Sequence, residues 1–182
     1  MRRIALMILS AILLVSCGPS GKVAKKSVKT YVQPGADLLD APDVLRAWAV
    51  GVSNSQMTAK KKAMASATAE LGRMLNTVVM TTIDDYCVSL ADKDAEVSKK
   101  FLSKKSNIVS EQMLVGVRQI FDQWEPVDKE GMHRNYVVLE LSAEEYIKKL
   151  IESINQSQKT ENINIDEKLL SDIFAKKVNS SK

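Results

Sequence analysis

Hydrophobic and polar positions alternate along Val44–Ser53, which reads VLRAWAVGVS. A period of two is typical of a β-strand, because successive side chains point to opposite faces. One face carries Arg46, Trp48, Val50 and Val52, and the other carries Leu45, Ala47, Ala49 and Gly51. Because small side chains allow a neighbouring element to come close, we expect a helix against the second face.

The stretch from Met57 to about Tyr86 predicts a long amphipathic helix. It contains no proline and one glycine, and the polar Ser53-Asn54-Ser55 cluster before it is suited to an N-cap. Its apolar positions recur at intervals of three and four residues: Ala63, Ala67, Leu71, Met74, Leu75 and Val78. A second, weaker helical pattern extends from Asp92 to about Ser106.

Two further strands and a helix follow. We predict strands over Gln112–Trp124 and Asn135–Leu141, joined by a hairpin turn between Pro126 and Gly131. Ser142 and Glu145 form a capping box for a helix that continues through Ile154.

The last helical pattern, Asp166–Val178, places Leu169, Leu170, Ile173 and Phe174 on one side. A helix this short is marginal alone, so it must dock on its own domain or on a partner.

These elements predict an α+β domain: a three-stranded antiparallel sheet with two main helices packed on it, in the order β-α-(α)-β-β-α, and an additional C-terminal helix. We divide the chain into a signal peptide (1–16), a lipidated cysteine with a flexible tether (17–43), the α+β domain (44–156), and a polar linker with a short amphipathic helix (157–182). A mature chain of about 165 residues suits one domain.

The first seventeen residues predict a bacterial lipoprotein signal peptide. Arg2 and Arg3 precede an apolar run over Ile4–Val15, which is short for a membrane-spanning helix. Leu14-Val15-Ser16-Cys17 reads as a lipobox, so we expect cleavage before Cys17 and acylation of its sulfur. By resemblance to the enterobacterial sorting rule, an aspartate directly after the lipidated cysteine retains a lipoprotein in the inner membrane. Residue 18 is a glycine, so we expect an outer-membrane anchor that faces the periplasm.

Composition excludes some classes of partner. Removal of the signal peptide takes away two of the 26 basic residues and none of the 22 acidic residues, which leaves a net charge near +2. We therefore expect no nucleic-acid partner. Lys22, Lys25, Lys26 and Lys29 in the tether are read as a solvated spacer or as weak contacts to anionic head groups.

The chain is poor in catalytic side chains. His133 is the only histidine, and Cys87 is the only cysteine besides Cys17, so no plausible zinc ligand set exists. Cys87 is read as a buried thiol, with an intermolecular disulfide or a reactive thiol as alternatives. The pairs Asp84-Asp85 and Glu144-Glu145 are adjacent, and adjacent residues on a helix do not face each other. We expect no enzyme activity, no cofactor and no metal site.

Four residues are candidate contacts to a ligand or partner. Trp48 and Trp124 either line a groove or pack in the core, and Leu170 and Phe174 form the apolar side of the last helix.

Residues 44 to about 153 resemble the Lpp-twenty family of membrane-associated twenty-kilodalton bacterial lipoproteins. The similarity rests on the strand RAWAVG, the helix AKKKAMASATAELGRML, the strand pair VGVRQIFDQW and NYVVLEL, and the closing helix. It implies a small α+β domain, an outer-membrane lipid anchor and roles of some members in envelope or appendage assembly, and it transfers no active-site residue.

The leading hypothesis is a non-enzymatic envelope lipoprotein whose domain binds a protein partner or a second copy through strand edges or the C-terminal helix. The alternative is a periplasmic lipoprotein that binds a lipid or a peptidoglycan fragment.

Overall fold

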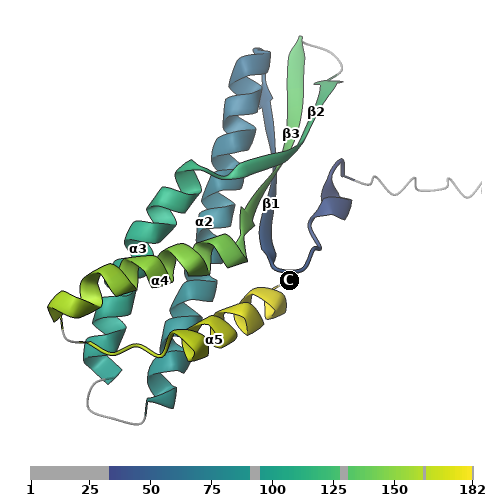
Figure 1. Cartoon of the computed structure of the whole chain (residues 1–182). Helices are drawn as coiled ribbons and strands as arrows, with labels where there is room; N and C mark the ends of the chain where they lie inside the picture. Colours follow the sequence, from purple (N-terminus) through teal and green to yellow (C-terminus); the bar gives the residue numbers. More distant parts are fainter. Residues whose placement is uncertain (1–32, 91–94, 128–130, 162, 182) are drawn as a thin grey trace, which may run out of the picture. The chain divides into compact units, whose positions relative to one another are not determined.

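The computed structural model describes residues 33–90, 95–127, 131–161 and 163–181. The predicted lipobox and the first part of the predicted tether lie outside these residues. The elements in chain order are η1 (Ala36–Leu38), β1 (Val44–Ser53), α2 (Gln56–Ser89), α3 (Ala95–Val115), β2 (Arg118–Val127), β3 (Met132–Ser142), α4 (Ala143–Glu161) and α5 (Glu167–Ser180) (Figure 1). No helix among the described residues has the length and apolar character needed to cross a membrane.

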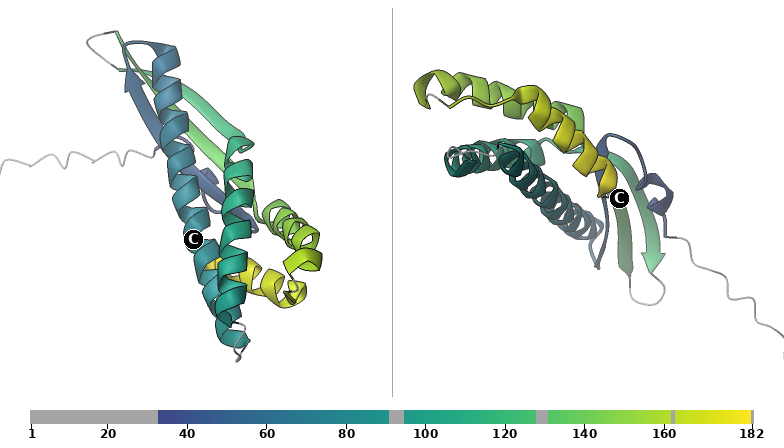
Figure 2. Two further views of the ribbon diagram at one scale, coloured as in Figure 1. Left: turned by 90° about the vertical axis from the view of Figure 1, so that its left-hand side faces the viewer. Right: turned by 90° about the horizontal axis from the view of Figure 1, so that it is seen from below.

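The three strands form one antiparallel sheet in the order β1-β3-β2, which confirms the predicted α+β class. β3 lies in the centre and pairs Ser142 with Val44 of β1 and Glu140 with Arg118 of β2. β1 and β2 are consequently the two edge strands. Helices α2 to α5 lie on one side of this sheet (Figure 2).

The small face of β1 lies directly under α2, as predicted. Ala59, Ala63 and Ala67 of α2 are fully buried. A Cβ atom added to Gly51 would lie 2.0 Å from the carbonyl oxygen of Ala59 and 2.6 Å from the backbone nitrogen of Ala63. Only a glycine therefore permits the backbones of β1 and α2 to come this close.

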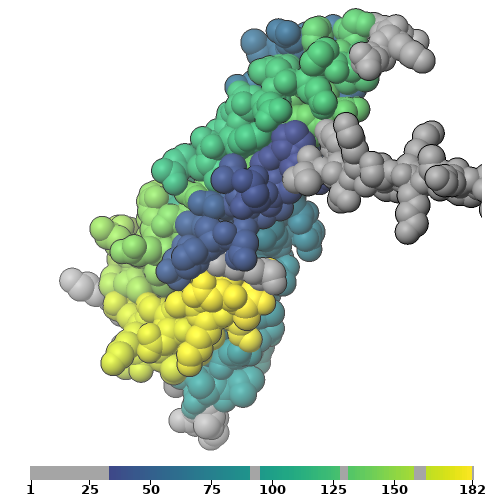
Figure 3. Space-filling model, turned by 90° about the vertical axis from the view of Figure 1, so that its right-hand side faces the viewer, coloured from purple at the N-terminus to yellow at the C-terminus, as the bar shows by residue number. Residues whose placement is uncertain are grey.

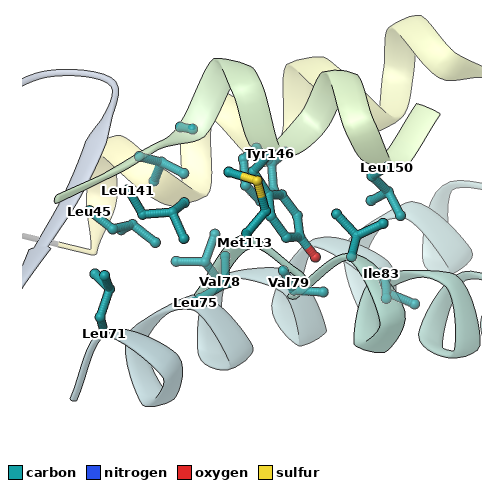
Figure 4. Close-up of a cluster of buried hydrophobic side chains, with 14 of the residues drawn as sticks. Leu45, Leu71, Leu75, Val78, Val79, Ile83, Met113, Leu141, Tyr146 and Leu150 are labelled. Atoms are coloured by element: carbon teal, nitrogen blue, oxygen red, sulfur yellow. The ribbon is translucent and has the colours of Figure 1, made fainter. Parts of the chain in front are cut away.

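The core lies between the sheet and α2 and continues among helices α2, α3, α4 and α5; Figure 4 shows part of it. Tyr146 of α4 is buried in it, and its hydroxyl lies 3.1 Å from Ser110 Oγ of α3. Burial raises the pKa of Tyr146 to about 12.

The predicted strand Gln112–Trp124 begins too early, because α3 continues to Val115 and β2 starts only at Arg118. The buried positions of α3 explain this, since they recur at helical spacing to its end: Ser98, Phe101, Leu102, Ser106, Val109 and Met113. Val115, which lies within the predicted strand, is exposed at the end of the helix.

α5 docks on its own domain, which is one of the two alternatives given above. Leu170 and Phe174 are buried, and the Phe174 ring stacks on Tyr146 at a centroid distance of 5.2 Å. The hydroxyl of Tyr86 accepts a hydrogen bond of 2.8 Å from the backbone N–H of Asp166, just before α5. Leu170 and Phe174 are therefore core residues in this structure and are not available at its surface.

Residues 33–42, assigned from sequence to the tether, lie across the sheet face opposite the helices, and we call them the strap. Trp48 Nε1 donates to the carbonyl oxygen of Pro34 (2.8 Å), and Arg46 Nη1 donates to that of Leu38 (2.6 Å). Gly35, with φ of 81°, packs so tightly that an added Cβ would lie 2.9 Å from the Phe121 ring. The strap is thus part of the folded domain.

Candidate interaction site at the edge of the sheet

The two edge strands differ in how they are protected against pairing with another strand. β2, RQIFDQWEPV, carries four charged or proline residues: Arg118, Asp122, Glu125 and Pro126. Its register with β3 shifts between Gln119 and Phe121, which marks a bulge. Charges, proline and bulges are the features by which natural edge strands avoid edge-to-edge pairing. β2 is therefore a protected edge.

β1 lacks this protection. Its ten residues, VLRAWAVGVS, contain no proline and one charged residue. That residue, Arg46, is engaged within the domain, where its Nη2 lies 2.6 Å from Glu140 Oε2. Lys62 of α2 reaches one end of the strand and donates to the carbonyl oxygen of Val52 (3.2 Å). A long apolar edge without charges pointing outward is suited to pairing with another strand.

A cavity of about 590 Å³ lies beside this edge. Its walls come from the strap, both faces of β1, α2 and the end of the described chain: Leu39, Asp40, Val44, Leu45, Arg46, Ala47, Trp48, Glu70, Met74 and Ser181. In Figure 3 the strap and the start of β1, in purple and blue, lie between the green atoms of the later elements and the yellow atoms of α5. Because residues from both faces of β1 line it, the cavity lies at the strand edge and can receive side chains from an added strand.

A cluster of charged side chains next to the cavity links the strands on the sheet face that the strap covers. Glu140 of β3 is 7% exposed and accepts hydrogen bonds from Arg46 Nε (2.8 Å) and from Arg118 of β2. Burial of this carboxyl acts to raise its pKa, but the hydrogen bonds and charges of Arg118 and Arg46 outweigh it and hold the pKa below its ordinary value. The cluster joins all three strands and also, through Arg46, the strap.

The two tryptophans do not come together. Trp48 pairs in register with Val138, and Trp124 pairs with Asn135, so they lie on opposite faces of the sheet. Trp48 lines the cavity and lies 6.0 Å from the Tyr136 ring between centroids. Trp124 is 39% exposed on the other face. Of the two, Trp48 alone belongs to the candidate site.

A second polar cluster lies under the start of α2. Asn135 is fully buried and donates to Asp122 Oδ1 (2.6 Å), while Lys60 Nζ lies 2.5 Å from Asp122 Oδ2. Burial acts to raise the pKa of Asp122, but hydrogen bonds from Lys60, Asn135 and Gln119 lower it overall. Asn135 Oδ1 has no partner among the described residues. The cluster ties α2 to the protected edge.

The acidic pair Asp84-Asp85 and Cys87 lie on α2, away from the cavity, and their contacts are with neighbouring helices. Asp84 pairs with Lys99 of α3 (2.7 Å) and Asp85 with Lys177 of α5 (2.6 Å), so each carboxylate links α2 to a different helix. Cys87 is half-buried, and burial raises the pKa of its thiol. Within the described part of the chain, no three His, Cys, Asp or Glu side chains gather into a possible metal site.

The strap and α2 contribute residues to the site that were not predicted from the sequence. Leu39 and Asp40 lay in a segment assigned to the tether, although its Pro34-Gly35 pair and the adjacent Leu38 and Leu39 signal a turn and an apolar contact. Met74 was predicted only as part of the apolar stripe of the helix, and Glu70 was not singled out. Neither could be placed beside β1, because a helical pattern does not show which strand edge a helix lies beside.

Comparison of the chain with protein-family models, with curated proteins and with solved structures finds no match.

Proposed function

We propose that this protein is a lipid-anchored bacterial envelope lipoprotein of the outer membrane, whose α+β domain faces the periplasm and acts as a non-enzymatic protein-interaction module. The observation that carries the interaction part is the unprotected edge of β1 beside an apolar cavity, in contrast to the protected edge of β2. A partner adds a strand to β1, and its side chains enter the cavity. The anchor rests on the lipobox at Leu14–Cys17.

Two matched variants test the interaction. Val50 and Gln123 both pair in register with Tyr136, from opposite edges of the same sheet face. We expect Val50→Lys to remove the partner from the protein extracted gently from its membrane, because a lysine on an edge strand opposes pairing. Gln123→Lys adds the same charge at the protected edge and should leave the complex intact. Equal effects of the two variants on complex mass would refute the role of β1.

The anchor is tested separately. The Cys17→Ser variant should incorporate no labelled palmitate, and its precursor should not be cut at the lipobox. Lipid labelling that persists in this variant would contradict the assignment of Cys17.

The cavity also supports a second candidate function, binding of a lipid or peptidoglycan fragment. Its volume of about 590 Å³ is in the range of small-molecule sites, and Trp48 lines it. A ligand that binds there should raise the unfolding temperature of the wild-type protein and less so that of Trp48→Ala. If no fragment shifts the unfolding temperature, this candidate fails while the interaction module stands.

A further inference from the structure

The charges beside the β1 edge are arranged symmetrically along α2. Lys62 lies at the Val52 end of the strand, where it donates to the Val52 carbonyl oxygen. Glu70 lies near the other end, where it lines the cavity together with Asp40 and accepts hydrogen bonds from Arg73 of its own helix (3.0 and 2.5 Å). Lys62 and Glu70 are each one helical turn from Ser66. The edge therefore has Lys62 at one end and the carboxylates of Asp40 and Glu70 at the other, on either side of Ser66. Arg73 is exposed beside Glu70, so a lysine from a second copy would share the Glu70 carboxylate with it.

The stretch of α2 between these charges is made of small, exposed residues. Ala65, Ser66 and Ala69 are all exposed. Because Gly51 contacts Ala63, while Glu70 lies beside the first half of β1, Ser66 lies near Ala49. Small side chains at this position allow the α2 helix of another molecule to approach closely.

The strand itself is compatible with antiparallel pairing to an identical strand. With Ala49 at the centre, Trp48 of one copy lies opposite Val50 of the other, and Arg46 lies opposite Val52. Aromatic residues paired with β-branched residues stabilise sheets, and no two like charges face each other in this register. The Val50 side chain, 37% exposed in the single chain, becomes covered.

We propose that two copies of this chain pair their β1 edges in antiparallel orientation about a two-fold axis near Ala49 and Ser66, which joins the two sheets into one of six strands. The axis brings Lys62 of each copy to Glu70 of the other. This inference rests on the proposed function, because it names the partner that the β1 edge binds. A strand from a different protein and residues 22–32 of the same chain are the competing occupants.

Charge reversal tests the geometry in the full-length lipidated protein, extracted in mild detergent. Lys62→Glu and Glu70→Lys each place like charges together twice, by symmetry, and should weaken self-association about tenfold. The double variant restores opposite charges and should return to within about threefold of wild type. Lys61→Glu makes the same charge change at the neighbouring exposed position and is the matched control. Circular dichroism confirms that each variant is folded.

Two differently tagged copies, expressed together, identify the partner. We expect either tag to recover the other, and Val50→Lys to abolish this while Gln123→Lys does not. If the single charge reversals weaken association and the double variant does not recover, the two-fold geometry is overturned. If the tags do not co-purify but Val50→Lys loses a different protein, the second copy is wrong and the proposed function stands. If no association depends on Val50, both the pairing of two copies and the proposed interaction function of β1 are wrong.

Discussion

Replacement of Gly51 by alanine tests the close approach of β1 and α2, on which the rest of the domain is built. The new Cβ would lie 2.0 Å and 2.6 Å from two backbone atoms of α2, so no side-chain rotation can relieve the overlap. α2 must move away from the sheet, which loosens the packing of Ala59, Ala63 and Ala67. Overpacking of a core typically costs about 1–3 kcal/mol, and an obstruction by backbone belongs at the upper end.

Alanine lowers the conformational entropy of the unfolded chain relative to glycine, and this stabilisation of the folded state offsets about 0.4–1 kcal/mol of the cost. The expected net change is a decrease of about 2 kcal/mol in the free energy of unfolding, equivalent to a decrease of about 4–8 °C in Tm for a domain of this size. Urea and thermal unfolding followed by circular dichroism measure both quantities. Gly116→Ala is the matched control, because the nearest atom to its new Cβ is 4.0 Å away. If Gly51→Ala is as stable as Gly116→Ala, the close approach is wrong.

Three further predictions concern the sheet face and α5. Glu140→Gln leaves the partly buried Arg46 without its counter-charge and should lower the free energy of unfolding by about 2 kcal/mol in urea titrations at pH 7; an unchanged midpoint would contradict this. Because the folded pKa of Glu140 is lowered, its stabilisation is present above the unfolded pKa and is lost on acidification, so the difference between wild type and Glu140→Gln should shrink below about pH 4; a difference that stays constant to pH 2 would argue against the charged contact. Phe174→Ala should lower the free energy of unfolding by about 3–4 kcal/mol in the same titration, because the ring is buried against Tyr146; a change under 1 kcal/mol would mean that α5 docks loosely.

The elements with a strong local pattern could be predicted from the sequence. The alternation of large and small residues in β1, the alanine spacing of α2 and the cap at Ser142 each specify a structure through neighbouring residues, whereas Asp166, predicted as the first residue of the last helix, is its N-cap. Ser142 Oγ accepts from the backbone N–H of Glu145 (3.2 Å), and Asp166 Oδ1 accepts from that of Leu169 (3.0 Å), as caps do.

The failures arose where long-range contacts decide the structure. At the end of α3, the run Gln112–Gly116 fits a strand and a helix equally well by periodicity, and packing of Met113 in the core selects the helix. The strap is held by hydrogen bonds from Arg46 to Leu38, 8 residues away, and from Trp48 to Pro34, 14 residues away, which the Ser-, Gly- and Pro-rich composition of this segment does not show. The candidate site depends on these same long-range contacts, so the sequence predicted strand edges as contact surfaces in general, and of the four candidate contact residues only Trp48 lies at this site.

The molar mass of the lipidated wild-type protein, extracted gently from its own membrane and measured by light scattering with the detergent contribution subtracted, shows whether the β1 edge holds a partner. The unprocessed chain has a mass of 20.1 kDa. We expect a protein mass of at least two chains per particle, which falls to one chain in Val50→Lys. A wild-type particle that contains one chain and no other protein would contradict an interaction module built on the edge of β1.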